Sequence, residues 1–512
     1  MKQHKPSPLT NSALVLAVTA ALYATNATAA DAYATAPTKP TATTPSAGLA
    51  NDWLRQQSDD FKPWDFGGQI RIREELKNNF GAPGLPGAID FRDKGGNAHN
   101  DYLLLREKVH VGYNHPWFSV YVEGRNSTEG GDDRNPNPEA DEFDLYQGYI
   151  MVGNPKEFGL TLKAGRQELN YGDERLIGSL DWVNIPRTFD AAKLRYEGKD
   201  GWVDAFVSRP VLADNHSFNQ NNEYETFSGL YASTKTIIPK QESQLYFLAR
   251  NASFESQAAH EKDFPQPAGA SPRDIYTVGA RVKSLPGQFG GWDYGTEVMY
   301  QFGRFRAAGT NFASGKLNVA DARLKKSLSH EAFAAFVGGG YTWTNLSITP
   351  RLGVEYNYAS GDSDPKDKEH DTFENLYPTN HKFYGLADFV SLQNIHNVRF
   401  MSSIAPFKNF TVALDYHLFW LADTSDHFYN VGGGTRPKQK AAGKGYGINA
   451  KYDSFVGSEL DLVATYKFKP WAIAQAGYAH FFTGGYIDQS LSNKAFGSKD
   501  ADYVYLQTTF NF

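Results

Sequence analysis

The chain has 512 residues, a formal net charge of −6 at pH 7 and no cysteine. Its mean hydropathy of −0.51, and the lack of any apolar run of about 20 residues, exclude transmembrane helices. Without cysteine there are no disulfides, so stability must come from burial and closed hydrogen bonding. Aromatic residues nevertheless make up 14% of the chain, and there are 47 glycines. This composition suits a β-barrel, in which only every second strand residue needs to be apolar.

The first residues are typical of a secretory signal peptide. Lys2 and Lys5 form a basic start, residues 12–23 are a short apolar core, and Ala27-Thr28-Ala29 offers a small-residue cleavage site. We therefore expect a signal peptide at 1–29. Residues 30–65 are rich in Ala, Thr and Pro, which predicts a low-complexity periplasmic leader. Residues 66–512 remain for the folded barrel.

The last ten residues, Tyr503 to Phe512, alternate strictly between one apolar and one polar face. Period two predicts a strand. In a soluble sheet the apolar face would meet a core, whereas in a membrane barrel it would meet lipid. One strand does not decide between these alternatives, so the spacing of the other strands is needed.

Alternating segments recur along the chain, and short and long connections between them alternate. The segments that we count as strands are 68–76, 101–114, 117–126, 143–152, 158–167, 189–196, 202–208, one on either side of 235–242, 275–283, 292–302, 331–343, 346–358, 397–404, 409–420, 459–468, 471–482 and 503–512, and residues 211–225 come between 202–208 and the next pair. Residues 445–453 also alternate, and we assign them to the extracellular loop or to an extension of the next strand, because a nineteenth strand would break the even number. This layout predicts an all-β, antiparallel transmembrane barrel of about 18 strands in the bacterial outer membrane, with short periplasmic turns and long extracellular loops.

The same alternation sorts the charged residues onto the lumen face, since lipid-facing Arg or Lys costs about 2–4 kcal/mol at the midplane. The inward basic positions are Arg71, Arg73, Arg106, Lys108, Arg125, Lys193, Arg195, Arg281, Arg351 and Arg399, and the inward acidic positions are Glu75, Glu123, Glu355, Asp415, Glu459 and Asp461. Arginine can bind carboxylates in a bidentate manner, so these side chains predict an anion-selective channel. Arg166 shares the parity of Leu160, Leu162 and Ala164, which means that either a bulge precedes it or it lies at the outer rim.

Several long strings resemble the alginate exporter family of outer-membrane proteins. They are Leu162–Tyr196, residues 375–381 with Phe383-Tyr384-Gly385 after them, Gly457–Phe468, Gly477–Tyr486 and the C-terminal YLQTTFNF. The resemblance covers about 70–512. It implies a monomeric 18-stranded barrel whose Arg-rich constriction passes a uronic-acid polymer outward. The positions that match the family's arginines are Arg71 and Arg73 in an RIR motif, Arg106, Arg166 in a GRQ motif, and Arg187 near an RTFDA string.

We expect no enzymatic activity, because the strand histidines have no accompanying nucleophile motif. The expected cargo is an anionic polysaccharide such as alginate, or its oligomers, moving by passive diffusion. Two alternatives stay open: a surface adhesin or receptor anchored by the barrel, and a specific porin for small sugar or aromatic acids. The expected partners are outer-membrane lipid, the barrel-assembly machinery and periplasmic polysaccharide-handling proteins, with no nucleic acid.

One acidic loop, residues 361–371, makes calcium an option, with Asp362 and Asp364 as weak candidate ligands. Its spacing lacks the EF-hand pattern, and no other cofactor is expected. Among the long loops, residues 360–394 are the natural candidate for a plug that folds into the barrel. The sequence does not give the direction of transport or name the sugar.

Overall fold

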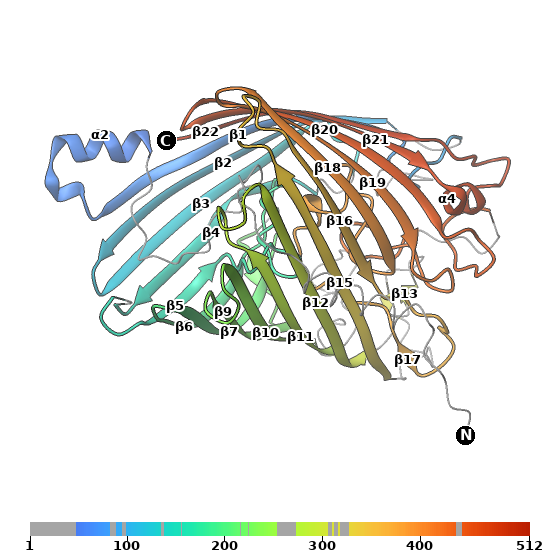
Figure 1. The fold of residues 1–512 in the computed structure, drawn as a ribbon, viewed down its shortest axis with the longest axis horizontal. Coiled ribbons are helices and arrows are strands. Elements are labelled where there is room, and N and C mark those ends of the chain that lie inside the picture. The colour runs from blue at the N-terminus through green and yellow to red at the C-terminus, as the bar shows by residue number, and fades with distance from the viewer. Residues whose placement is uncertain are drawn as a thin grey trace.

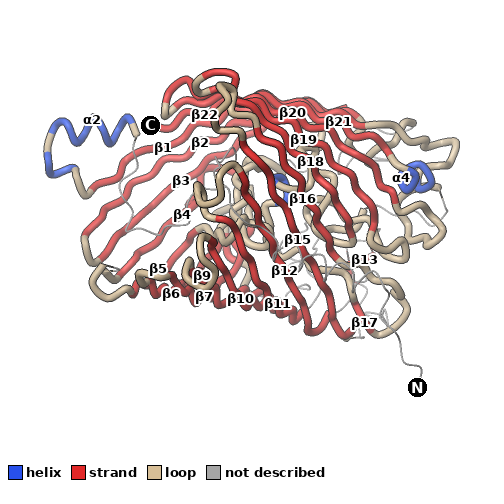
Figure 2. Tube along the Cα trace, in the orientation of Figure 1, coloured by secondary structure: helices blue, strands red, loops and turns tan. Residues whose placement is uncertain are grey.

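In the computed structural model the chain forms one closed antiparallel barrel of eighteen strands (Figures 1 and 2). The structure describes residues 48–81, 89–94, 99–134, 138–154, 156–215, 217–223, 225–252, 273–305, 310–311, 316–317, 327–436 and 443–512. The signal peptide predicted at 1–29 lies outside these residues. No helix in the described residues is long and apolar enough to cross a membrane.

The barrel strands follow one another around the wall in chain order. They are β1 (Trp64–Asn78), β2 (His99–His115), β3 (Phe118–Gly130), β4 (Asp141–Val152), β5 (Leu160–Gln167), β6 (Phe189–Glu197), β7 (Gly201–Leu212), β9 (Glu225–Thr234), β10 (Gln241–Ala252), β11 (Arg273–Ser284), β12 (Trp292–Phe305), β15 (Leu328–Thr342), β16 (Arg351–Ala359), β18 (Ile395–Phe407), β19 (Phe410–Leu421), β20 (Phe455–Lys469), β21 (Ala472–Thr483) and β22 (Ala501–Asn511).

Short elements decorate the connections. They are the helices α2 (Leu49–Gln57) and α4 (Gly485–Ser490), the 3-10 turns at Asp59–Phe61 and Asn380–Lys382, and the two-residue strands β8 (Gln220–Asn221), β13 (Thr310–Asn311), β14 (Lys316–Leu317) and β17 (Glu369–His370). Helix α2 falls within the segment 30–65 that we expected to be a leader without regular structure.

Two of the segments named from the sequence differ in the structure. Residues 211–225 do not form a strand of their own, because β7 ends at Leu212 and β9 begins only at Glu225. The strand predicted at 346–358 begins at Arg351, because residues 343–350 form a longer turn. Residues 445–453 are a loop, which is the first of the two assignments that the sequence left open.

The terminal strands close the barrel. β22 pairs with β1 from Gln69 opposite Asn511 to Asn78 opposite Asp502. Phe512 continues the pairing, since it exchanges two backbone hydrogen bonds of 3.0 Å with Gly68. The predicted role of the last ten residues as the closing strand is confirmed. A closed barrel leaves no open edge across the hydrocarbon layer, where an unpaired backbone group would be costly.

The connections are short at one end of the barrel and long at the other. Turns of two to eight residues join the strands at the end where β1 begins, and connections of 10 to 35 residues join them at the opposite end. In outer-membrane barrels the short turns are periplasmic and the long loops extracellular. The C-terminus and α2 therefore lie at the periplasmic end (Figure 1).

Candidate functional site: a lumen crossed by two loops

Alternation along the strands places the charged side chains inside, as predicted. On β1, Ile72 is 42% exposed on the outer face, whereas Arg71 and Arg73 are only 3% and 1% exposed. On β2, Leu103 and Val109 are exposed and Arg106 is buried. Buried charge in a strand is tolerated only when it is paired or hydrogen-bonded. What these inward side chains contact therefore decides what the lumen can do.

The loop between β5 and β6, residues 168–188, crosses the lumen. At one side Asp181 contacts Arg106 and Lys108 of β2. At the other side Asp173 forms an ion pair of 2.5 Å with Arg281 of β11. In the order of strands around the wall, β2 and β11 are eight strands apart in a ring of eighteen. A segment that touches both must span the interior.

A cluster of basic groups surrounds Asp181. Its carboxylate accepts a hydrogen bond of 3.0 Å from Arg106 Nη2 and one of 3.1 Å from Lys108 Nζ. Arg71 donates to the backbone oxygens of Asp181 and Val183 at 2.8 and 3.0 Å. The Asp181 side chain remains 55% exposed. Two cations thus bind the Asp181 carboxylate and a third, Arg71, binds the adjacent backbone, and we call Arg71, Arg106 and Lys108 the basic cluster.

Arg73 extends this arrangement to an aromatic side chain. It donates to the Trp182 backbone oxygen at 2.7 Å, and its guanidinium lies 3.9 Å from the centre of the Trp182 ring. Trp182 also stacks on His381 with a ring separation of 3.9 Å. His381 belongs to the loop between β16 and β18. The two rings therefore join two loops inside the barrel.

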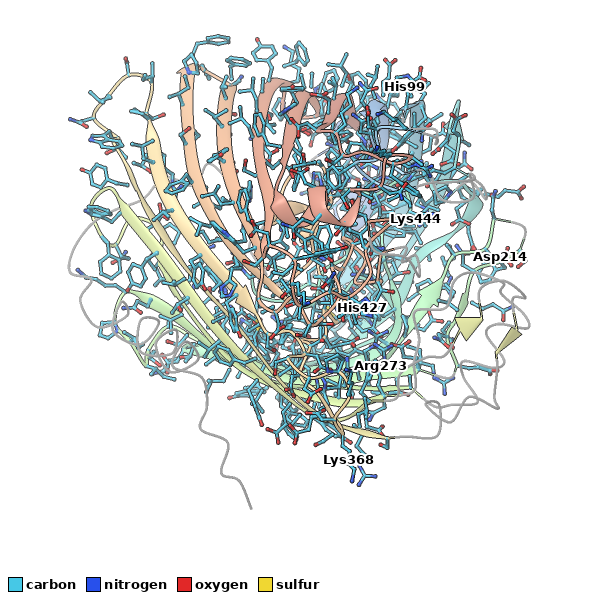
Figure 3. The ribbon with its side chains drawn as sticks, turned by 90° about the vertical axis from the view of Figure 1, so that its right-hand side faces the viewer. His99, Asp214, Arg273, Lys368, His427 and Lys444 are labelled. Carbon is cyan, nitrogen blue, oxygen red and sulfur yellow. The ribbon has the colours of Figure 1, made fainter. Side chains whose placement is uncertain are left out.

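This second loop, residues 360–394, also folds inward, which confirms the predicted plug. Its Glu374 forms ion pairs of 2.5 Å with Arg250 of β10 and Arg273 of β11. On the other side its Leu386 and Ala387 N–H groups donate to Asp461 and Glu459 of β20. Figure 3 shows Arg273 among the side chains crowded within the ring of strands.

Backbone pairing ties the two loops together. Ile177 and Tyr377 form a parallel bridge, in which Gly178 N–H donates to Tyr377 O at 2.8 Å and Tyr377 N–H donates to Leu176 O at 2.9 Å. Ile177, Leu176 and Tyr377 are buried in one apolar cluster inside the barrel. The sequence suggested one inward loop; the structure has two that pack as a unit.

The loop carboxylates are held in their charged form. Enclosure by the barrel wall raises the pKa of Asp181, but Lys108, Arg106 and Arg71 outweigh this effect and hold the pKa well below its usual range. Asp173 behaves in the same way, because Arg281 and Lys283 outweigh burial. Burial raises the pKa of Glu374, but Arg273 and Arg250 outweigh this effect and lower the pKa to about 2. At neutral pH all three anchors are therefore ionised.

Most of the predicted lumen residues lie in ion pairs rather than facing open space. The pairs are Arg73 with Glu75, Arg125 with Asp141, Lys193 and Arg195 with Asp204, Arg281 with Asp173, Arg351 with Asp293, Arg399 with Asp415, and Glu355 with Arg175. Glu123 accepts from Gln147. Arg187 lies in the first loop and donates to the backbone oxygens of Gly178 and Pro378. The lumen is consequently a mixed-charge network, in which the Asp181 side chain is 55% exposed and the basic cluster that holds it is buried.

Arg166 does not line the lumen. It lies opposite Asp190 in the register of β5 and β6 and forms an ion pair of 2.9 Å with it. On β6, Ala192 and Leu194 follow Asp190 at intervals of two and so share its face of the strand. Both are exposed on the outer face of the barrel. Arg166 is covered by Asn219, whose backbone oxygen accepts from it at 2.9 Å. Of the two alternatives left open by the sequence, the outer rim is correct.

Strand periodicity missed the residues that anchor the loops. Asp173, Arg175, Asp181 and Glu374 lie in connections, where no alternation assigns a face. Arg175 is the clearest example, since it is buried between the rings of Phe336 and Phe383 and donates to Glu355 at 2.6 Å. The long strings that resemble the exporter family pointed to the first segment, and the length of the loop at 360–394 pointed to the second.

The acidic loop at 361–371 shows no assembled ion site. Asp362 accepts from the Asp364 N–H, and its own N–H donates to Asp426. Within the described ranges, no group of three or more His, Asp or Glu side chains is placed to hold a metal ion. Calcium binding by this loop therefore stays a prediction.

Taken together, the closed eighteen-stranded wall, the apolar outer face and the charged lumen define an outer-membrane β-barrel channel of the porin class. Solved structures support the fold. OpdK of Pseudomonas aeruginosa superimposes with a TM-score of 0.52 at 11% identity, over 88% of this chain and 98% of that chain. OpdQ of the same organism gives 0.50 at 13% identity, over 88% and 99%.

The sequence profile described as Alginate export matches residues 62–495, and the chain belongs to this family. The match spans every barrel strand except β22, which follows it. It includes both lumen-crossing loops, so the family assignment covers the candidate site as well as the wall. No curated protein sequence matches the chain.

Proposed function

We propose that this channel passes an anionic polysaccharide such as alginate, or its oligomers, by passive diffusion through its charged lumen. The observation that carries the proposal is the basic cluster around the half-exposed carboxylate of Asp181. Each sugar of a uronic-acid polymer carries one carboxylate. A cluster that already holds a protein carboxylate at 3.0 and 3.1 Å offers the geometry that such a sugar requires.

Interleaved acidic groups serve the same function. A pore lined by arginine alone would hold a polyanion too tightly for it to leave, and conduction requires binding that is weak and distributed over several sites. Asp181 can exchange with a substrate carboxylate at the basic cluster while the loop backbone stays bonded to Arg71 and Arg106. The transport is non-enzymatic, and the barrel-assembly machinery and periplasmic polysaccharide-handling proteins are the partners that the proposal requires.

The test is single-channel conductance of the Asp181→Asn variant in planar bilayers. One charge at about 8 Å changes the energy of an ion by about 0.5–2 kcal/mol for an effective dielectric constant of roughly 80 to 20. Removing the carboxylate charge should therefore raise the preference for anions, and the block by added alginate oligomers, by a factor of about 2 to 30. Asp200→Asn removes the same charge from the exposed turn between β6 and β7 and serves as the matched control.

An unchanged reversal potential in Asp181→Asn would contradict the role of the cluster. A complete lack of current in the purified protein would favour the adhesin or receptor alternative instead.

A second candidate, passage of small sugar or aromatic acids, is favoured by one observation. The two loops are joined across the lumen by the Trp182–His381 stack and the Ile177–Tyr377 bridge. Joined loops narrow the path, which suits a small acid better than a polymer. One crystal structure of OpdK is that of the protein with vanillate, a small aromatic acid. Block by vanillate but not by alginate oligomers would select this candidate.

A further inference from the structure

The first strand extends beyond the last one at the periplasmic end of the barrel. β1 begins at Trp64, but its pairing with β22 and Phe512 reaches only to Gly68. On the side of β1 that pairs with β22, residues Trp64 to Gly67 thus extend beyond the end of β22. We call the junction of these two strands the seam. Unpaired strand edges expose backbone donors and are normally covered.

Helix α2 covers this edge through one side chain. Asn51 Oδ1 accepts a hydrogen bond of 2.8 Å from the Phe66 N–H, and Asn51 Nδ2 donates to Asp65 Oδ1 at 2.7 Å. Asn51 is 1% exposed. Figure 1 shows α2 beside the C-terminal end of β22, where this contact would place it. The helix therefore has a fixed orientation, with Asn51 toward the barrel.

The face of α2 that points away from the barrel is apolar. At 3.6 residues per turn, Leu49 and Trp53 lie one turn apart on the side roughly opposite Asn51. Leu49 is 46% exposed and Trp53 is 61% exposed. Asp52, Gln56 and Gln57 flank this face, whereas Arg55 lies on the side of Asn51 and donates to the Trp64 backbone oxygen at 3.4 Å. A short helix with Leu and Trp on one face and polar residues beside them is typical of helices that lie in a membrane interface.

The neighbouring wall carries an aromatic belt at the same level of the barrel. Trp64 packs against Phe66 at 5.5 Å and against Tyr113 at 5.0 Å between ring centres. Phe158 lies in the turn between β4 and β5 at the same end of the barrel and is 66% exposed. Aromatic belts of outer-membrane barrels lie at the headgroup level. Six residues separate the end of α2 from Trp64, so the helix adjoins the belt.

We propose that α2 lies in the periplasmic leaflet boundary of the outer membrane, with Leu49 and Trp53 inserted among the lipid headgroups and upper acyl chains. The helix continues the aromatic belt across the seam between β1 and β22. Lipid is the occupant because the apolar face joins a surface that already contacts lipid. This inference does not depend on which cargo the channel carries.

The test uses a fluorescent label at single cysteines, which the cysteine-free chain permits. Trp53→Cys, labelled with a short environment-sensitive dye, is placed in phospholipid vesicles as the full-length folded barrel. We expect blue-shifted emission that doxyl-labelled lipids quench and aqueous iodide does not. Phe158→Cys in the belt is the lipid-facing control, and Lys199→Cys, whose native side chain is 91% exposed in a turn at the same end, is the water-facing control.

Emission at position 53 that matches the label at position 199 would overturn the proposal. Emission shifted to the blue but insensitive to doxyl lipids would indicate a protein contact and would overturn it as well. Leu49→Cys reports on the same face if Trp53→Cys assembles poorly. Heat-modifiable migration of each variant in gels shows that the barrel itself is folded.

Discussion

Replacing Glu355 by leucine should release the first lumen-crossing loop from the far wall. Glu355 Oε2 accepts from Arg175 Nη2 at 2.6 Å, and both side chains are almost fully buried. Asn357 Oδ1 accepts from the same guanidinium at 2.8 Å. Glu355→Leu leaves the Arg175 charge buried with a neutral amide partner. The loop can escape this cost by moving Arg175 toward water.

The magnitude follows from the burial of the pair. Breaking a buried ion pair by removing one partner costs about 3–5 kcal/mol. Each 1.4 kcal/mol is a factor of ten, so the fraction of molecules with the loop released should rise by a factor of about 10² to 4 × 10³. The barrel wall keeps its backbone pairing, because β16 remains bonded to β15 and β18. The expected change is therefore local.

The assay is the alkylation rate of Ser179→Cys, the single thiol in an otherwise cysteine-free chain. Ser179 is 5% exposed, and its backbone oxygen accepts from Arg187 N–H at 2.7 Å, so the thiol reacts only when the loop opens. Glu355→Leu in this background should accelerate labelling by the factor given above. Channel conductance should rise in parallel.

Two variants complete the design. Arg175→Met combined with Glu355→Leu replaces the pair by apolar side chains, and labelling should return toward the parent rate because no charge is left buried. Asp293→Asn removes one charge from an ion pair whose two partners, Asp293 of β12 and Arg351 of β16, both belong to the wall, and it should leave labelling unchanged. Acceleration of less than tenfold in Glu355→Leu would refute the reasoning.

Three further predictions concern the seam and the acidic loop. Deleting Phe512 removes both backbone bonds to Gly68, so we expect less heat-modifiable barrel in the outer membrane; normal insertion would count against this. Asn51→Ala leaves the Phe66 N–H without its acceptor, which should cost about 1–3 kcal/mol and lower the midpoint of urea unfolding; an unchanged midpoint would show that water replaces the amide. Burial and the adjacent Asp426 raise the pKa of Asp362 to about 7, above the usual value of about 3.9. At a pH between these two pKa values, the Asp362 carboxyl is protonated in the folded loop and ionised in the unfolded loop. The hydrogen-exchange protection of the loop should therefore be greatest at low pH and decline as the pH rises through 7. Asp362→Asn should weaken this dependence, and the remainder should come from Asp371, whose pKa is raised to about 6 by burial and Glu369. Calcium added at pH 8 should restore protection only if the loop binds it.

The two-residue periodicity of the strands was sufficient to predict most of the fold. On β1, lipid-facing Ile72 lies between the inward Arg71 and Arg73, and the cost of basic charge in lipid enforces that pattern locally. The closing role of β22 followed from the same rule. The rule placed the start of one strand too early, at residue 346, because the turn at 343–350 has no lipid or core to select its faces.

The sequence by itself determined the barrel, its orientation and the inward parity of most charges, since a period of two and the length of each connection are local properties. Only the tertiary structure decided which side chains those charges meet. Arg71 and Arg106 hold the backbone of a loop, Arg166 lies at the rim, and Asp181 is the exposed carboxylate among three cations. Such contacts join residues about 70 to 110 positions apart, and they arise only when a loop without periodicity folds across a lumen already formed by the strands.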